Sequence, residues 1–206
     1  IPTDAPHDLE VVARTCASRI DLAHEAGIQD VFRHLANNEA RTEAIAADVR
    51  EAFGLGRKVL VLTERTEHLG AVAAMLSGIV PPPFVLHGRM STKQRAALIA
   101  ALDALAPDAP RILLATGKLV GEGFDHPPLD TLVLAMPVSW KGTLQQYAGR
   151  LHRQHASKAD VRIIDFVDTA HPALLRMWDR RQRGYRAMGY RILVGEARNC
   201  DAVPLI

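Results

Sequence analysis

The chain has 206 residues, of which 48% are apolar and 23% are charged, and its formal net charge at pH 7 is +2. These are ordinary globular proportions, which exclude a collagen, a coiled coil and a disordered chain, and the length is sufficient for one large domain with its own hydrophobic core. The small positive charge permits an anionic partner without requiring one. No apolar run reaches the roughly 18 residues that a membrane span needs, so we expect no membrane partner.

The two cysteines, Cys16 and Cys200, lie near opposite ends of the sequence, and neither belongs to a C-x-x-C pair. This spacing argues against both a zinc ribbon and a disulfide scaffold. The sequence opens with Ile1–Asp4 rather than with the charged and then apolar segments of a secretory signal. We therefore expect a protein of the reducing cytoplasm.

From Asp8 to Phe53, apolar residues recur at intervals of three to four positions, which is the period of a helix face. Asn38 is a suitable N-cap for the second half of this segment, because its side chain can accept a bond from the backbone of the first helical turn. We expect residues 1–55 to form a helical N-terminal arm. The residues that set the period are Leu9, Val12, Cys16, Ile20, Ile45, Val49, Ala52 and Phe53.

After Gly56, short apolar runs alternate with helical stretches of about ten to fifteen residues. Continuous apolar runs indicate strands that are buried on both faces, and helices between such strands indicate a parallel sheet sandwiched by helices. We predict one α/β domain over residues 56–194, followed by a tail over residues 195–206. The predicted strands are Val59–Leu62, Phe84–Leu86, Ile112–Ala115, Leu132–Met136 and Val161–Val167.

Three helices of this domain carry signals at their first turn. Ser91–Gln94 and Thr143–Gln146 have the pattern of a capping box, and Pro172 suits the first turn of the last helix. In that last helix, Trp178 and Tyr185 are interleaved with arginines. The helix could offer nucleic acid a basic track with stacking side chains, or it could bury its aromatic rings and hold its arginines at the surface.

A glycine-rich loop follows the third predicted strand. Residues 116–125 contain three glycines within seven positions and end at Asp125. Glycines let backbone N–H groups approach a phosphate closely, although such a loop can also be an ordinary structural turn. His126 stands where a G-x-G-x-x-G pattern would need its third glycine, which disfavours a dinucleotide site.

The helix after the fourth predicted strand places Gln146, Gly149, Arg150 and Arg153 on one face, at positions i, i+3, i+4 and i+7. Two guanidinium groups side by side are suited to a terminal phosphate, although the same residues could form a cap and a solvated face. A glycine inside a helix costs about 1 kcal/mol relative to alanine. We therefore expect another backbone or a ligand to approach Gly149 closely.

These residues carry a resemblance to a known family. Gln146–Arg153 reads Q-Y-A-G-R-L-H-R and resembles motif VI of superfamily 2 helicases, Q-x-x-G-R-x-x-R. Ala115–Pro128 resembles motif V and Val59–Arg65 resembles motif IV, while Leu86–Arg95 is similar to the H-G-x-M-x-x-x-x-R element between them. The order of the four elements is that of the family. Within it, the chain most resembles bacterial DEAD/DEAH-like proteins related to the motor subunit of type III restriction enzymes.

The resemblance implies a RecA-like parallel sheet with helices on both faces, the second of two such domains that bind ATP and Mg²⁺ between them. Arg150 and Arg153 would then reach the γ-phosphate as arginine fingers, Arg153 being the finger proper, and Gln146 would orient the phosphate or the attacking water. Gly123 and Asp125 match positions that approach the nucleotide, where Asp125 would accept a bond from a ribose hydroxyl.

The resemblance also implies contacts with nucleic acid, and we expect DNA rather than RNA. Thr116 and Gly117 match the position that holds a backbone phosphate through a hydroxyl and a backbone N–H. His87, Gly88 and Arg65 are further candidates for the same strand, and the alternative for each is an ordinary loop residue.

The sequence contains neither a G-x-x-x-x-G-K-[ST] loop nor a D-E-x-[DH] string after an apolar strand. Those two elements supply the phosphate cradle and the Mg²⁺ site of such motors. We expect the chain to be the second half of a motor whose first RecA-like domain lies upstream in the same polypeptide. By itself it would bind no ATP or metal and would hydrolyse essentially no ATP. The alternative is a non-catalytic module, derived from a helicase domain, that binds nucleic acid or protein.

Overall fold

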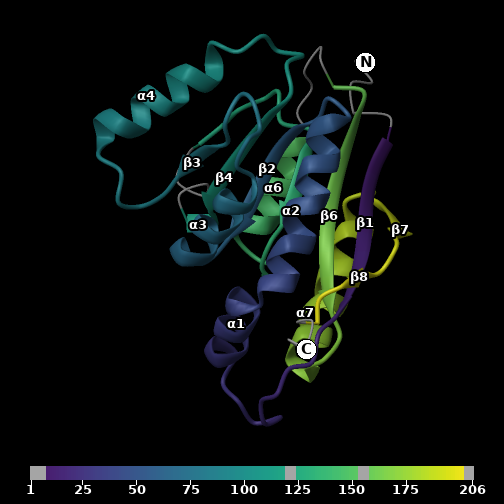
Figure 1. Cartoon of the computed structure of the whole chain (residues 1–206). Helices are drawn as coiled ribbons and strands as arrows, with labels where there is room; N and C mark the ends of the chain where they lie inside the picture. Colours follow the sequence, from purple (N-terminus) through teal and green to yellow (C-terminus); the bar gives the residue numbers. More distant parts are fainter. Residues whose placement is uncertain (1–7, 119–123, 153–157, 202–206) are drawn as a thin grey trace.

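The computed structural model describes residues 8–118, 124–152 and 158–201. Across them, seven strands form one sheet in the order β3-β4-β2-β5-β6-β1-β7, and a short β8 pairs with β1 (Figure 1). The pairings among these strands are parallel. The strands are β1 (Asp8–Ala17), β2 (Lys58–Thr63), β3 (Phe84–Leu86), β4 (Arg111–Thr116), β5 (Thr131–Leu134), β6 (Asp160–Asp168), β7 (Arg191–Val194) and β8 (Arg198–Asn199).

Helices cover both faces of the sheet. One face packs against α2 and α3, the opposite face packs against α6 and α7, and α4 lies over the edge strand β3 (Figure 1). No helix of the described residues is long and apolar enough to cross a membrane. The helices are α1 (Ile28–Asn37), α2 (Glu39–Gly54), α3 (Thr66–Met75), α4 (Thr92–Asp103), α6 (Thr143–Leu151) and α7 (Pro172–Ala187).

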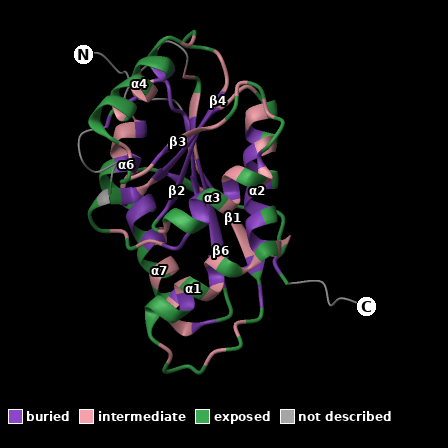
Figure 2. Cartoon of the chain, turned by 60° about the vertical axis from the view of Figure 1, so that its left-hand side comes forward, coloured by how far each residue is buried: buried purple, intermediate pink, exposed green. Residues whose placement is uncertain are grey.

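The central strands bury both of their faces. In β2, Val59 and Val61 belong to the core under α2 and α3, whereas Leu60 and Leu62 belong to the core under α6 and α7. The same alternation holds in β4 and β5. Figure 2 shows these buried strands between helices whose outer surfaces are exposed. The predicted parallel sheet with helices on both faces is therefore confirmed, and continuous apolar runs are its signature.

The helical expectation is wrong for the first described segment, which forms the strand β1. It pairs with β6 along Asp8–Cys16 on one side and with β7 along Glu10–Ala13 on the other. Leu9, Val12 and Cys16 happen to share helical spacing, but a β-branched segment that is paired on both sides gains more from the sheet. Further along the predicted arm, residues 18–27 form a loop, and helix is confirmed only for α1 and α2.

The helix starts are partly as predicted. Asn38 caps α2 by accepting a 3.0 Å bond from the backbone N–H of Arg41, and the capping box of Ser91–Gln94 is present. Pro172 occupies the first turn of α7. The second predicted box is wrong, because the N-cap of α6 is Gly142, with a φ of +76° that glycine adopts without strain.

Cys16 and Cys200 form a disulfide, although their spacing in the sequence argued against a disulfide scaffold. Strand β8 returns alongside the end of β1, which brings the two Cα atoms to 5.6 Å, within the range that a disulfide bridges. The side-chain amide of Asn38 also donates a 2.8 Å bond to the carbonyl of Cys200. The cytoplasmic location stays a prediction.

The aromatic rings of α7 belong to the core. Tyr185 is fully buried, and Trp178 packs against the same cluster. The structure therefore favours the second interpretation of this helix, in which the aromatic rings are buried and the arginines lie at the surface, over a basic track with stacking side chains. One arginine departs from that reading, because Arg181 is also buried.

Two buried arginine–aspartate pairs hold α2 and α7 to the end of β6. On one face, Arg181 binds Asp165 through two bonds of 2.8 and 2.9 Å, and the Tyr185 hydroxyl donates a third bond to the same carboxylate at 2.9 Å. On the other face, Arg41 binds Asp168 through bonds of 2.9 and 3.0 Å. Such bidentate pairs fix the position of a helix, because the two parallel hydrogen bonds form only over a small range of distances and angles.

A buried neutral histidine joins β2, α2 and α3. His68 Nδ1 lies 3.0 Å from the Thr63 hydroxyl and Nε2 lies 3.3 Å from the Thr42 hydroxyl. Burial, together with the charges of Arg41 and Arg65, lowers the pKa of His68 from 6.5 to about 3. The ring is therefore neutral at physiological pH and is held by hydroxyls that can donate or accept.

The substitution Arg181→Met removes one partner of a buried pair and leaves the Asp165 carboxylate without its counterion. We expect it to lower the free energy of unfolding by about 3–5 kcal/mol, measured by urea denaturation. The matched control is Arg180→Met on the exposed side of α7, which should change the stability by about 0.5 kcal/mol or less. Equal effects of the two substitutions would contradict this account of α7.

Stability should fall as the pH drops below about 6.5, because the unfolded chain then protonates His68 while the folded chain, with a pKa of about 3, does not. The contribution of His68 is about 1.4 kcal/mol for each pH unit within this window. Urea denaturation at pH 7, 6 and 5 would measure it against His68→Asn, which cannot gain the proton. We expect the free energy of unfolding to depend less steeply on pH in the variant. The same slope in the variant and the wild type would refute the assignment to His68.

Candidate functional site

Candidate residues from two strands meet at the carboxyl edge of the sheet. Thr63, at the end of β2, pairs in register with Thr116, at the end of β4. Arg65 lies two residues after Thr63 and Gly117 directly follows Thr116, so the structure brings Arg65, Thr116 and Gly117 to one place. Ligands of open parallel sheets bind at this edge.

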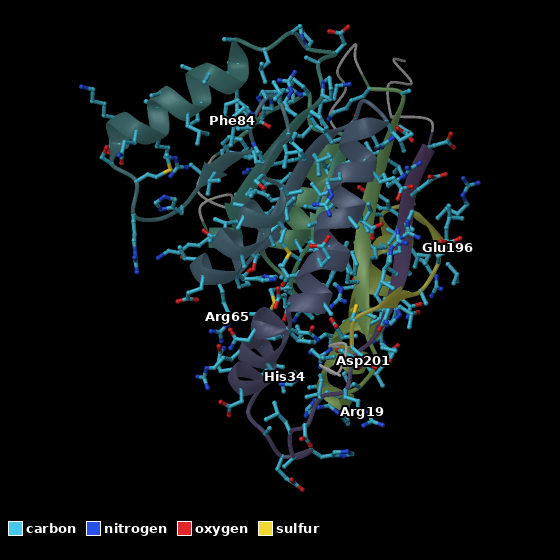
Figure 3. The ribbon with its side chains drawn as sticks, in the orientation of Figure 1. Arg19, His34, Arg65, Phe84, Glu196 and Asp201 are labelled. Carbon is cyan, nitrogen blue, oxygen red and sulfur yellow. A yellow bond between two sulfur atoms is a disulfide. The ribbon has the colours of Figure 1, made fainter. Side chains whose placement is uncertain are left out.

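A cavity of about 680 Å³ opens at this edge and includes Arg65 and Gly117 in its wall. Arg65 Nη2 donates to the backbone carbonyl of Gln29 at 3.2 Å and lies 3.3 Å from its side-chain oxygen, so it joins the end of β2 to α1 (Figure 3). The residues that line the cavity are Ile28, Gln29, Phe32, Leu62, Glu64, Arg65, Gly117, Pro137, Val138, Ser139, Lys141, Leu144 and Met177.

His87 and Gly88 lie at the same edge but outside the cavity. They follow Leu86, the last residue of β3, which pairs with Ala115 of β4. His87 is half-buried, and its Nδ1 accepts a 3.3 Å bond from the backbone N–H of Arg89. Gly88 is exposed, and a Cβ added to it would meet nothing within 4 Å. The structure therefore gives Gly88 no steric reason to be glycine.

A second group of candidate residues gathers around Arg150 on α6. Arg150 Nη1 donates a 2.7 Å bond to the carbonyl of Phe124, and its guanidinium carbon lies 6.0 Å from the ring centroid of Tyr147. Asp125, the neighbour of Phe124, lines a small hollow of about 10 Å³ together with Arg150 and Tyr147. This volume is close to that of one water molecule, so a nucleotide would lie against this surface rather than inside it.

The remaining predicted residues of α6 are placed as follows. Gln146 is exposed one turn before Arg150, on the same face of the helix. A Cβ added to Gly149 would lie 3.8 Å from the methyl carbon of Met188, which is an ordinary contact. Packing among the described residues therefore does not explain Gly149. Arg153 and Gly123 lie outside the described residues.

Sequence reasoning missed the role of His126, which directly follows Asp125 and anchors the loop that carries it. His126 is buried, with Nε2 3.0 Å from Nη1 of Arg111 and Nδ1 3.1 Å from a carboxylate oxygen of Asp103. Since arginine can only donate, Nε2 accepts and Nδ1 carries the proton that it donates to Asp103. The loop that carries Asp125 is thereby tied to α4 and to the start of β4.

Sequence reasoning also missed most of the wall of the cavity. Ser139 and Lys141 follow β5, as candidate residues follow β2 and β4, and the rule that ligands bind beyond strand ends would have found them. Phe32 and Gln29 come from α1, which no motif marks as part of a site. In the described parts of the chain, no group of three or more His, Cys, Asp or Glu side chains could hold a metal ion.

Several solved structures share the fold at low sequence identity. UvsW of T4 superposes with a TM-score of 0.68 at 17% identity, over 90% of this chain and 42% of UvsW. Dbp5 of S. cerevisiae, in its structure with RNA and ADP BeF3, gives 0.57 at 13% identity over 93% of this chain and 42% of Dbp5. Domain 2 of the DEAD-box helicase Mss116p, bound to an RNA duplex, gives 0.55 at 14% identity over 94% of this chain and 64% of that one.

The chain thus spans less than half the length of UvsW and of Dbp5. These likenesses confirm the RecA-like fold of a helicase C-terminal domain. At the level of sequence, the uncharacterized protein 108L of Invertebrate iridescent virus 3 is 40% identical over 88 residues, which are 42% of this chain and 78% of 108L. Residues 44–155 match the model of the helicase conserved C-terminal domain. Because these residues make up more than half of the sequence, the chain belongs to the helicase conserved C-terminal domain family.

Proposed function

We propose that this chain is the second RecA-like lobe of an ATP-dependent helicase or translocase. It would supply Arg150 and Arg153 to ATP and Mg²⁺ held by a first lobe of the same polypeptide, and would grip nucleic acid at the carboxyl edge of its sheet. The observation that carries the proposal is the surface cluster of Arg150 and Asp125, in which the guanidinium is held 2.7 Å from the carbonyl of Phe124. Family membership supports it.

Arg150 is suited to the role of a finger by the way it is held. The carbonyl of Phe124 accepts a 2.7 Å bond from Nη1, and this bond orients the guanidinium. During phosphoryl transfer, negative charge spreads over the γ-phosphate, and a positioned arginine stabilises that charge. Arg153 and Gln146 would act on the same phosphate or on the attacking water, and Asp125 and Gly123 would contact the nucleotide.

The nucleic-acid backbone would bind at Thr116 and Gly117, which precede Asp125 in the sequence, and at Arg65. Thr116 offers a hydroxyl, Gly117 a backbone N–H and Arg65 a cation, which are the groups that bind a backbone phosphate. His87 and Gly88 would extend this contact along the edge.

We extend the proposal to DNA as the substrate, and we propose membership of the type III restriction motor group on the strength of the four motif strings. Dbp5 and Mss116p are bound to RNA in their structures, which supports a nucleic-acid partner of either kind. ATPase assays can distinguish DNA from RNA as the substrate, because we expect only one of them to stimulate ATP hydrolysis.

In a polypeptide that joins this chain to its first RecA-like lobe, Arg150→Ala and Arg153→Ala should each lower kcat for ATP by about 10³-fold while nucleotide still binds. Steady-state ATPase assays with DNA and with RNA would measure the first effect, and binding of a fluorescent nucleotide would measure the second. Arg186→Ala, an exposed arginine of α7, is the matched control and should retain full turnover. Unchanged turnover in both finger variants would refute the proposal.

The 206-residue chain alone should hydrolyse ATP no faster than a buffer control, with or without nucleic acid, because the phosphate cradle and the metal site would both come from the first lobe. A sensitive phosphate-release assay tests this expectation. Turnover by the chain alone that is lost in the Arg150→Ala variant would show that it carries a complete site of its own.

A further inference from the structure

We infer that the cavity between α1 and the carboxyl ends of β2, β4 and β5 receives one unstacked base of a single-stranded nucleic acid. The inference rests on the proposed nucleic-acid role of this edge and goes beyond a grip on the backbone. Its ground is the wall of the cavity, which combines an aromatic ring and apolar side chains with cations at the rim. A grip on phosphates alone needs only the cations.

The size and inner surface of the cavity suit a flat aromatic ring. Its volume of about 680 Å³ lies within the range of roughly 300–1,000 Å³ that holds small organic ligands. Phe32 from α1, Val138 after β5 and Met177 from α7 supply apolar surface. A base can stack on Phe32, and the thioether of Met177 makes favourable contacts with aromatic rings.

The charged side chains of the wall suit the rest of a nucleotide. Among the described residues of the wall, Arg65 and Lys141 provide two positive charges and Glu64 one negative charge, a balance that favours an anion. The cations, with Thr116 and the backbone of Gly117 beside them, can hold the phosphates on either side of the inserted base. The Glu64 carboxylate can accept bonds from the N–H groups on the edge of a base.

The wall formed by α1 is fixed before any ligand arrives. Val31 and Leu35 of α1 are fully buried in a cluster with Met136 and Leu174, while Phe32 packs against the same cluster. Arg65 adds its bond to Gln29 at the start of the helix. A preformed wall loses little conformational entropy when a ligand binds, which favours capture of a base by this surface.

The test compares an ordinary oligonucleotide with one of the same length whose bases are replaced by abasic sites, both labelled at one end. Binding to the 206-residue chain is measured by fluorescence anisotropy without ATP, in one series with DNA and one with RNA. We expect the abasic strand to bind about tenfold more weakly, because the phosphates are kept and base stacking is lost. The nucleic acid that shows the larger loss is the one whose bases contribute more to binding.

Phe32→Leu keeps an apolar side chain for the packing of α1 but removes the aromatic face, and Phe32→Tyr keeps both. We expect Phe32→Leu to weaken binding of the ordinary strand several-fold and to leave binding of the abasic strand unchanged, while Phe32→Tyr resembles the wild type. Leu55→Ala changes an exposed apolar residue outside the cavity, which is 67% accessible, and is the control for nonspecific loss.

The outcomes separate this inference from the proposed function. Equal binding of ordinary and abasic strands by the wild type overturns base capture and leaves the backbone grip intact. Equal loss for both strands in Phe32→Leu also overturns it, because the residue then acts on the fold or on the phosphates. Failure of the wild type to bind either strand overturns the nucleic-acid role itself.

Discussion

The arrangement of the site depends on the two buried arginine–aspartate pairs at the end of β6. Asp165 and Asp168 point to opposite faces of the sheet, so one pair fixes α7 and the other fixes α2. Each arginine also donates to a carbonyl beyond the end of β5, Arg181 to Val138 at 3.1 Å and Arg41 to Ala135 at 2.6 Å. The segment after β5, which forms part of the cavity wall, is therefore held from both faces.

These pairs define position more than they add net stability. Removing two charges from water costs several kcal/mol, which their attraction offsets only when all their hydrogen-bonding groups are satisfied. Here the Tyr185 hydroxyl and the two carbonyls add further hydrogen bonds to the buried charges. A register shift of β6 by one residue would exchange the faces of Asp165 and Asp168 and leave both arginines unpaired, so the network admits one arrangement of sheet and helices.

The sequence predicts the central sheet well because burial on both faces imposes a continuous apolar pattern that few other structures share. It predicts the ends of the sheet poorly. In β1, Leu9, Val12 and Cys16 satisfy a helical period by coincidence, and only pairing with β6 and β7, far away in the sequence, makes the segment a strand. The disulfide and the Arg181–Asp165 pair escape prediction for the same reason, since both depend on which distant segments the fold brings together.

The same limit explains why the sequence predicts the motif residues as site candidates but not the residues around them. A motif marks side chains that act on a ligand, whereas Phe32 and His126 are defined by the neighbours that the fold gives them. The two ends of segment 116–126 also differ in volume, with a cavity of about 680 Å³ at Gly117 and a hollow of about 10 Å³ at Asp125. A large cavity can hold part of a ligand within one lobe, whereas a surface with so small a hollow needs a second surface to enclose a nucleotide. Under the proposed function, this difference would let the lobe keep its strand bound while the nucleotide cleft opens and closes.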